Sequence, residues 1–565
     1  MYDSIELSRK IPNGPIWPLM RPRPLNMNQY NVHFLDLPNE ILFLILRKLN
    51  NIDVLYSLLD IVNQRLDNIV QHQIFTNILN FVSISQSTDE VSSISSTILD
   101  RFCVSILPKI HENVKSLIVE SISMECTLRA AYYPNLTELK IFNFNKAIVS
   151  RYFMDDSLFG HNYKQQITDL ILISNENNIE ITSVEYTKNV YSIILAFFES
   201  LKHLSIVSSL NENYPKSINN YPCFSLYKLP PTIFSSSTLT KLCVNVIEFN
   251  DCLALLDGRL KQLTIFIIQV VHISDSILTN YNRDDLPHLK CFSLTCYNGT
   301  RGYDNLIVPL LRRMSHVEEL ALYLHIFRGS TFISGTDLDN EILIYMPQLH
   351  MFTFYIDSIN QIADPAIRAS AADIEQTFKN IKYGPVVCMV DSFDSYCVRY
   401  RVFSLPTKFH RLEDIKNNIP NIVFNSVTHL KLRDTNAFKH EFFIRLARAF
   451  PFLKSLSISN IHRPFWRCDE RHLRDKDWCS IIEYSHLIFL DVEGVNSYYL
   501  EHFLNETKAH LPSLTQLKVI YEVLKTVTEN FTRDDMRRNC GRVKRLIVDY
   551  PIVYPENVYR YFPLL

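Results

Sequence analysis

The stretch AYYPNLTELKIFNF, residues 131–144, decides the fold, because its pattern of apolar residues returns along most of the chain. Its core reads apolar-x-x-apolar-x-apolar, from Leu136 through Leu139 to Ile141. Leu139 and Ile141 are two residues apart, so both side chains point to the same side of a short strand. Pro134 stands two residues before Leu136 and cannot continue a helix. The stretch therefore predicts a stop signal followed by a strand with one apolar side.

The same pattern occurs fourteen times, and most copies lie about 20 to 35 residues apart. A proline stands two residues before the first Leu in four further copies, and segments with helical spacing precede several copies. A single helix–strand unit of this size cannot bury its own apolar side, whereas a stack of such units can. The copies begin at Val114, Leu136, Ile167, Leu201, Leu239, Leu260, Leu289, Val317 and Leu349, and after a longer interval at Val427, Leu453, Leu487, Leu514 and Val543.

This array resembles the leucine-rich repeat, in its long class that carries helices. The resemblance covers residues 114 to about 550 and implies an α/β fold, a curved solenoid whose parallel sheet lines the concave face with helices outside. The asparagine-rich turn that usually follows the strand is mostly missing. We expect repeats over 114–355 and 427–565. In the interval 356–426, the segment 383–406 alternates like a β-hairpin, so the interval holds either an inserted hairpin or one or two degenerate repeats.

Composition narrows the classes of partner and compartment. The chain has 565 residues with 57 basic and 59 acidic side chains, so it shows no charge excess for gripping nucleic acid or a membrane surface. Its twelve cysteines form no CxxC pair, which is typical of reduced thiols in an intracellular protein. No apolar run approaches the ~20 residues that span a bilayer. We expect a cytoplasmic, possibly nuclear, protein with no membrane and no nucleic-acid partner.

The N-terminal part has a different organisation from the array. Residues 1–30 are rich in proline and predict a mobile arm, 31–80 have a helical pattern, and 81–113 predict a linker and a capping helix. Six successive apolar residues, Ile41 to Leu46, cover every direction around a helix axis, although a helix on one neighbour needs a single stripe. Because about 40 residues are too few for a self-sufficient core, the surplus apolar faces need a partner.

Residues 35–67 resemble the F-box, with VNQR (62–65) one residue longer than the usual ending. The resemblance implies docking on a Skp-type adaptor, and through it on a cullin with a RING protein. It also implies that Leu42, Leu46 and Leu58 form the core of the box. The alternative is that the first helix is a buried cap of the repeat array. The matching residues are Leu37, Pro38, Glu40, Ile41, Ile45, Leu46, Leu49, Asp53, Val54, Leu55, Ser57, Leu58, Val62, Asn63, Arg65 and Leu66, of which Leu37, Pro38, Ile41, Ile45 and Leu49 would bind the adaptor.

In leucine-rich repeats the residues that alternate with the apolar positions point into the concave face, which suits recognition of a protein substrate. The alternative is a solvated polar face without a ligand. A second candidate is the charged segment 461–479, with Trp466 and Trp478. Its His462, Cys468, His472 and Cys479 lack the close pair that pre-orders a zinc site, so we expect no metal. The candidate substrate-binding residues on the concave face are Tyr323, Tyr355, His429, Lys431, Arg433, Asp491, Glu493 and Lys518.

No catalytic signature stands out. The ten glycines form no GxGxxG or GxxxxGK[ST] motif, and neither GxSxG nor HExxH occurs. We therefore expect a protein that is not an enzyme and needs no cofactor. The leading hypothesis is the substrate-recognition subunit of an SCF-type ubiquitin ligase. The alternatives are a leucine-rich-repeat scaffold that acts outside any ligase and, as a third class, an enzyme within 356–426.

Overall fold

The structure is a computed structural model that describes residues 34–565 apart from 62, 85–90, 155–156, 158–162, 175–181, 209–223, 275–284, 330–331, 363–367, 393–396, 417, 435–437, 461–479 and 551–552. The chain divides into two compact units, Met1–Asn50 and Asn51–Leu565, which are described separately. This boundary falls inside the predicted helical region 31–80. The described part of the first unit holds the short helix η1 (Phe34–Asp36) and the helix α1 (Asn39–Leu46).

The second unit begins with α2 (Asn51–Leu58), α3 (Gln64–Val70) and α4 (Gln73–Thr76), and α2 packs against the first strand of a large sheet. From β5 to β12 each strand is parallel to the one before it in sequence and lies directly beside it. Among the described residues this sheet has twelve strands, which are, in spatial order, β1 (Ile78–Asn80), β4 (Ser116–Glu120), β5 (Glu138–Phe142), β6 (Asp169–Ser174), β7 (His203–Ser208), β8 (Lys241–Glu248), β9 (Ile265–His272), β10 (Cys291–Thr300), β11 (Glu319–Arg328), β12 (Met351–Gln361), β14 (Cys397–Ser404) and β13 (Val386–Ser392).

The register of this sheet follows the repeated apolar pattern. Equivalent positions of neighbouring strands lie side by side, as Leu139 does beside Leu117 and Leu170, and these side chains are buried. One copy is displaced from the predicted position. Phe266, and not Leu263, lies beside Leu242, so the copy begins at Leu263 instead of Leu260. The run of apolar residues from Leu263 to Ile268 satisfies the pattern in both positions, and only pairing with β8 selects one of them.

The interval 356–426 contains both structures that its sequence left open. β14 pairs antiparallel with β12 and with β13, so this hairpin adds no parallel repeat to the sheet. The next strand, β15 (Arg411–Ile415), runs parallel to β16 (His429–Asp434) and is a degenerate repeat. An irregularity shifts the register between Leu412 and Ile415. The spacing of apolar residues is therefore broken there, which is why the pattern misses this strand.

A second parallel sheet has six strands among the described residues: β15, β16, β17 (Ser455–Asn460), β19 (Phe489–Asp491), β21 (Gln516–Val519) and β22 (Arg545–Val548). The helix α16 (His440–Ala449) buries Phe443 and Leu446 in the core of this part of the chain. The core also takes in residues of the first sheet, among them Tyr355 and Phe403. The two sheets therefore share a hydrophobic core.

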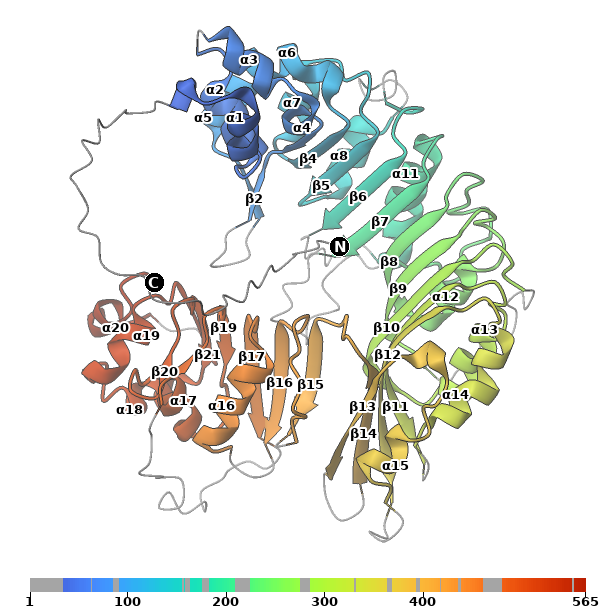
Figure 1. The fold of residues 1–565 in the computed structure, drawn as a ribbon, viewed down its shortest axis with the longest axis vertical. Coiled ribbons are helices and arrows are strands. Elements are labelled where there is room, and N and C mark those ends of the chain that lie inside the picture. Colours follow the sequence, from blue (N-terminus) through green and yellow to red (C-terminus); the bar gives the residue numbers. More distant parts are fainter. Residues whose placement is uncertain are drawn as a thin grey trace, which may run out of the picture. The chain divides into compact units, whose positions relative to one another are not determined.

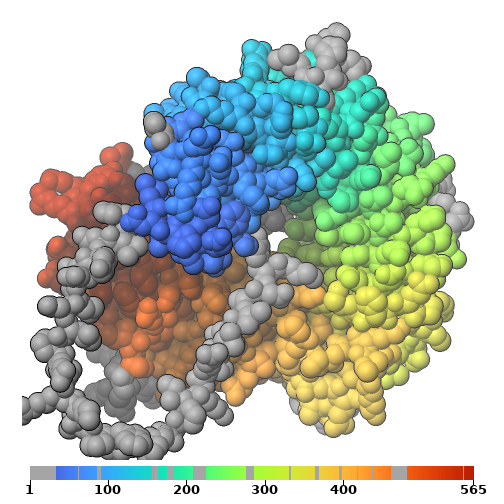
Figure 2. Space-filling model, turned by 45° about the horizontal axis from the view of Figure 1, so that its top comes forward, coloured from blue at the N-terminus to red at the C-terminus, as the bar shows by residue number. Residues whose placement is uncertain are grey.

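Helices lie along one side of the strands, as Figure 1 shows for α12, α13 and α14 beside β8 to β11. In the space-filling view the residues from about 100 to 400 follow one another as a continuous band in sequence order (Figure 2). Small two-stranded pairs are formed by β2 (Val82–Ile84) with β3 (Val91–Ser93) and by β18 (Ile482–Glu483) with β20 (Ala509–His510). The remaining α-helices are α5 (Ser96–Arg101), α6 (Leu107–Ile110), α7 (Met124–Ala130), α8 (Lys146–Tyr152), α10 (Ser183–Tyr186), α11 (Ser192–Phe197), α12 (Phe249–Leu255), α13 (Val308–Leu311), α14 (Gly335–Glu341), α15 (Ala371–Glu375), α17 (Ser497–Leu504), α18 (Tyr521–Val527), α19 (Arg537–Cys540) and α20 (Glu556–Tyr561).

In the part of the chain that the structure describes, no helix is both long and apolar enough to cross a membrane.

The repeat register can be tested at β10. Leu294 is fully buried, and its replacement by Ala should lower the free energy of local unfolding by about 2–5 kcal/mol, because a cavity remains between two neighbouring strands. Hydrogen exchange followed by mass spectrometry should show faster exchange in β9, β10 and β11. Ser293→Ala, on the opposite face of the same strand, is the matched control. Equal exchange in both variants would contradict the assigned register.

Candidate functional site

The first candidate surface is the apolar side of α1. Successive residues of a helix are rotated by about 100° around its axis, so the side chains of α1 fall into a buried arc and an exposed arc. Leu42 and Leu46 are buried, whereas Ile41, Ile45 and Leu44 are 42%, 41% and 56% exposed. Leu49, just beyond the helix end, is 54% exposed. The helix is therefore apolar on a buried side and on an exposed side.

The predicted adaptor-binding residues lie on the exposed arc or beside it. Pro38, Ile41, Ile45 and Leu49 are exposed, and Leu37 is half-buried. Phe34 and Leu35, which the motif does not include, add 41% and 45% exposed side chains next to them. Scattered exposed apolar residues are ordinary, so it is the gathering of six of them, Phe34, Leu35, Ile41, Leu44, Ile45 and Leu49, within 16 residues that makes this segment a candidate interaction surface.

Two of the predicted substrate-binding residues are not on an open surface, and the expectation for them is wrong. Tyr323 and Tyr355 are each 1% exposed, and their rings stack with centroids 4.5 Å apart. Phe409 packs edge-on against Tyr323, and the Tyr323 hydroxyl donates to the backbone oxygen of Arg411 at 3.0 Å. The chain that leads into β15 thus covers this part of the first sheet. The two tyrosines belong to the core that joins the sheets.

The other predicted residues are half-buried, and all of them except Glu493, which follows β19, lie on strands of the second sheet. His429, Lys431 and Arg433 alternate along β16 and so share one face.

A second group lies further along this sheet. Lys518 and Asp491 are paired residues of β21 and β19, and the Lys518 Nζ lies 3.4 Å from Asp491 and 2.5 Å from Glu493. Burial nevertheless raises the pKa of the Asp491 carboxyl. The structure thus brings Lys518, Asp491 and Glu493 together. The strand β17 separates these three residues from those of β16.

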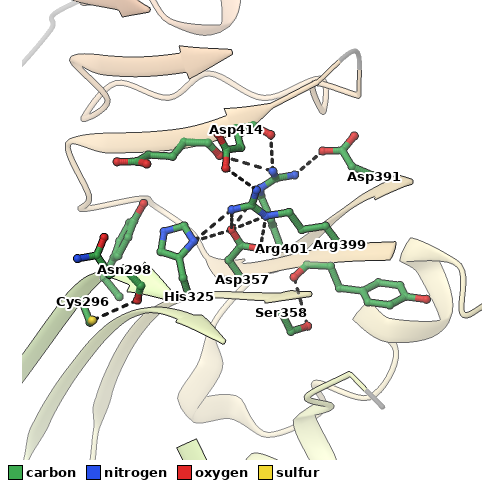
Figure 3. Close-up of polar contacts among 12 residues, drawn as sticks. Cys296, Asn298, His325, Asp357, Ser358, Asp391, Arg399, Arg401 and Asp414 are labelled. Atoms are coloured by element: carbon green, nitrogen blue, oxygen red, sulfur yellow. Dashed lines mark hydrogen bonds and ion pairs between the residues drawn. The ribbon is translucent and has the colours of Figure 1, made fainter. Parts of the chain in front are cut away.

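A buried network of charges lies where the two sheets meet, and its members were not singled out from the sequence. Arg399 of β14 donates to both oxygens of Asp357 of β12, at 2.7 Å from Nε and 2.5 Å from Nη2, and at 2.9 Å to Asp414 of β15. Arg401 is fully buried and pairs with Asp391 of β13. The Nδ1 atom of His325 lies 2.8 Å from Asp357. Figure 3 shows these side chains gathered around Asp357.

Electrostatics in this network favour ionised groups. Burial by itself raises the pKa of a carboxyl, but the charges of Arg399 and Arg401, together with a hydrogen bond from His325, hold the pKa of Asp357 well below its usual value. The sequence signal was the alternation CVRYRVF, residues 397–403, in which two arginines share one face of a strand. An acidic partner is required for two arginines on a buried face, but the sequence does not say which of the many carboxylates supplies it.

The sequence also predicted that the chain holds no metal site. His462, Cys468, His472 and Cys479, together with Trp466 and Trp478, lie outside the described residues. Among those that are described, no three His, Cys, Asp or Glu side chains gather closely enough to hold a metal ion.

Comparison with known proteins found similarity at the level of structure. No protein-family model matches the chain, and no curated protein sequence matches it. Among solved structures, the crystal structure of a Rad7 and Elc1 complex in yeast aligns with 86% of this chain and 88% of that chain, at 13% sequence identity and a TM-score of 0.23. A TM-score of this size does not establish a shared fold, so the proposal below rests on the chain's own residues.

The buried network predicts a pH-dependent contribution to stability. Arg399→Met leaves Asp357 with its main partner removed and should lower the free energy of unfolding by about 3–5 kcal/mol at pH 7. Because the folded pKa of Asp357 is depressed, the contribution is complete above its unfolded pKa of about 4 and is lost as the pH falls below that value. Denaturation curves from pH 7 to pH 3 should show the difference between the proteins narrowing.

The matched control is Arg328→Met, which breaks the more exposed pair Arg328–Asp304 and should cost no more than about 1 kcal/mol. Adding Asp357→Asn to Arg399→Met should restore part of the lost stability, because the unpaired buried charge is removed. A loss with Arg399→Met that is independent of pH would contradict the electrostatic assignment.

Proposed function

We propose that this protein is the substrate-recognition subunit of an SCF-type ubiquitin ligase. A Skp-type adaptor binds the exposed side of α1 and links the chain to a cullin, while the leucine-rich repeats bind a target protein. The chain makes and breaks no bonds and needs no cofactor. Its contribution is to hold the target near the ubiquitin-conjugating enzyme, which raises the effective concentration of the reacting groups.

The observation that carries the proposal is the exposure of apolar side chains at the positions that the F-box pattern assigns to the adaptor. Ile41 and Ile45 are one helical turn apart, and each exposes about two fifths of its surface. Leu42 and Leu46, which the same pattern assigns to the core of the box, are buried. Leu58, the third core position of that pattern, is half-buried. A simple cap of the repeat array would have no reason to present this second apolar side to water.

The rival is a leucine-rich-repeat scaffold that acts outside a ligase. Its support is the same array of parallel strands, which provides a polar surface whether or not an adaptor binds. The two functions differ in one requirement. Only a ligase receptor needs α1 to bind a Skp-type adaptor, so adaptor binding separates them. The compartment, cytoplasmic or nuclear, stays a prediction from the cysteine content.

The double variant Ile41→Asp/Ile45→Asp tests the proposal. Burying an Ile side chain contributes about 1.5–3 kcal/mol, so loss of two should weaken adaptor binding by at least about 100-fold. Calorimetry with a purified Skp-type adaptor and the full chain gives the affinity. Because both side chains are exposed in the isolated chain, the thermal unfolding curve should stay almost unchanged.

Ile381→Asp is the matched control, since Ile381 is 94% exposed and lies far along the chain in η9 (Ile381–Tyr383). It should bind the adaptor as the unaltered protein does. An unaltered chain that fails to bind adaptor, cullin or both would favour the scaffold. Adaptor binding that survives the double variant would show that α1 is not the docking element.

A further inference from the structure

A cavity of about 370 Å³ lies beside the buried charge network. Both sheets contribute to its wall: Tyr297 comes from β10, His325 from β11, Ile359 from β12, Arg399 from β14 and Arg433 from β16. On the parallel strands β10, β11, β12 and β16, the contributing residues stand toward the carboxyl ends, where α/β sheets place ligands. Its volume is within the range of sites that bind small molecules or parts of a polypeptide.

One polar atom of this wall has no partner within the described residues. His325 is 5% exposed, and its Nε2 atom is buried without a hydrogen bond. On the other side of the ring, Nδ1 lies 2.8 Å from the Asp357 carboxylate, which can only accept, and 3.2 Å from Nη2 of Arg399, which can only donate. Because the contact with the carboxylate is the shorter one, we assign the proton to Nδ1. In the neutral ring Nε2 is then a hydrogen-bond acceptor. Because an unmet buried acceptor is destabilising, this atom indicates a missing donor.

The arginines and carboxylates that line the cavity balance: Arg399 and Arg433 stand against Glu413 and Asp414. Both arginines lie within 4.0 Å of Asp414. Arg399 already donates to Asp357 and Asp414, and Arg411 lies 2.5 Å from Glu413. Ile326, Phe327 and Ile359 add apolar wall. The cavity therefore offers an acceptor in neutral surroundings and no preference for a charged ligand.

We propose that this cavity receives a carboxamide side chain of the target protein, whose N–H group donates to Nε2 of His325. The inference rests on the proposed function, because that function supplies a polypeptide as the occupant. A carboxamide is neutral, planar and able to donate and accept at once, so it can satisfy His325 while its oxygen faces the arginine-lined side. Asn or Gln in the target would then be selected over an apolar residue of the same shape, because only the amide satisfies the buried acceptor.

The test uses three probes of matched size: the N-acetyl N-methylamides of asparagine, leucine and aspartate. Binding to the full chain is measured by ligand-observed NMR titration. We expect the asparagine probe to bind at least tenfold more tightly than the leucine and aspartate probes. Equal binding of asparagine and leucine probes, preference for aspartate, or no binding by any probe would each overturn the proposal.

Two variants locate the binding. His325→Leu removes the acceptor and should weaken the asparagine probe at least tenfold, to the level of the leucine probe. His325→Leu also removes a donor to Asp357, so a second variant, Phe327→Trp, is needed. Phe327 lines the cavity and is 47% exposed. A larger ring at this position narrows the cavity without altering the charge network. His350→Leu, at an exposed histidine just before β12 that does not line the cavity, is the control and should leave binding unchanged. Unchanged binding in both cavity variants would overturn the assignment of the site.

The α1 double variant separates this inference from the proposed function. Ile41→Asp/Ile45→Asp should bind the asparagine probe like the unaltered chain while losing the adaptor. If the chain never binds adaptor but discriminates among the probes through His325, the cavity assignment holds and the ligase assignment fails. If the chain binds the adaptor but does not discriminate among the probes, the ligase assignment holds and the cavity assignment fails.

Discussion

A strand of the large sheet can bury its apolar side only if the next unit lies beside it in the same register, and the rest of the structure depends on this constraint. Leu117, Leu139 and Leu170 occupy equivalent positions on three successive strands, and each is fully buried. No unit has enough apolar surface to fold alone, so stability comes from the interfaces between units. Such an array extends as long as units are added, which explains a sheet of this width.

The array changes character where the hairpin of β13 and β14 is added. Antiparallel pairing with β12 brings two arginines onto a face that the following segment then covers, and buried arginines require carboxylates beside them. Asp357, Asp391 and Asp414 supply these from three different strands. The joint between the sheets is therefore fixed by directional ion pairs as well as by the stacked tyrosines Tyr323 and Tyr355. Apolar packing alone would tolerate sliding between the sheets more readily.

The two surfaces to which we assign functions differ in the forces that they offer a partner. The α1 surface is apolar and exposed, which suits a partner that shields it continuously, as an adaptor in a stable complex does. Among the buried polar side-chain atoms that line the cavity in the described part of the chain, Nε2 of His325 alone has no hydrogen-bond partner. A site of that kind gains selectivity from one hydrogen bond rather than affinity from area. Recognition and attachment would thus be separated along the chain.

The sequence by itself determined the repeating part of the fold, because the pattern of each strand is local and its meaning does not depend on distant residues. Thirteen of the fourteen copies lie in the predicted register, and the exception at Leu263 arises where an apolar run fits the pattern in two positions. The two apolar sides of α1 were also visible, since helical geometry alone divides Ile41 and Ile45 from Leu46.

Only the tertiary structure decided which polar positions of the strands face solvent. Tyr323 and Glu319 occupy the same face of β11, yet Tyr323 is buried because a segment 88 residues further along crosses it. Asp357 and Arg399 are 42 residues apart and meet only because the hairpin folds back on β12. Contacts of this kind depend on chain topology, which no local pattern of residue types encodes. The degenerate strand β15 escaped detection for a related reason, since its irregular pairing is stabilised by Arg399 and Arg401 from β14.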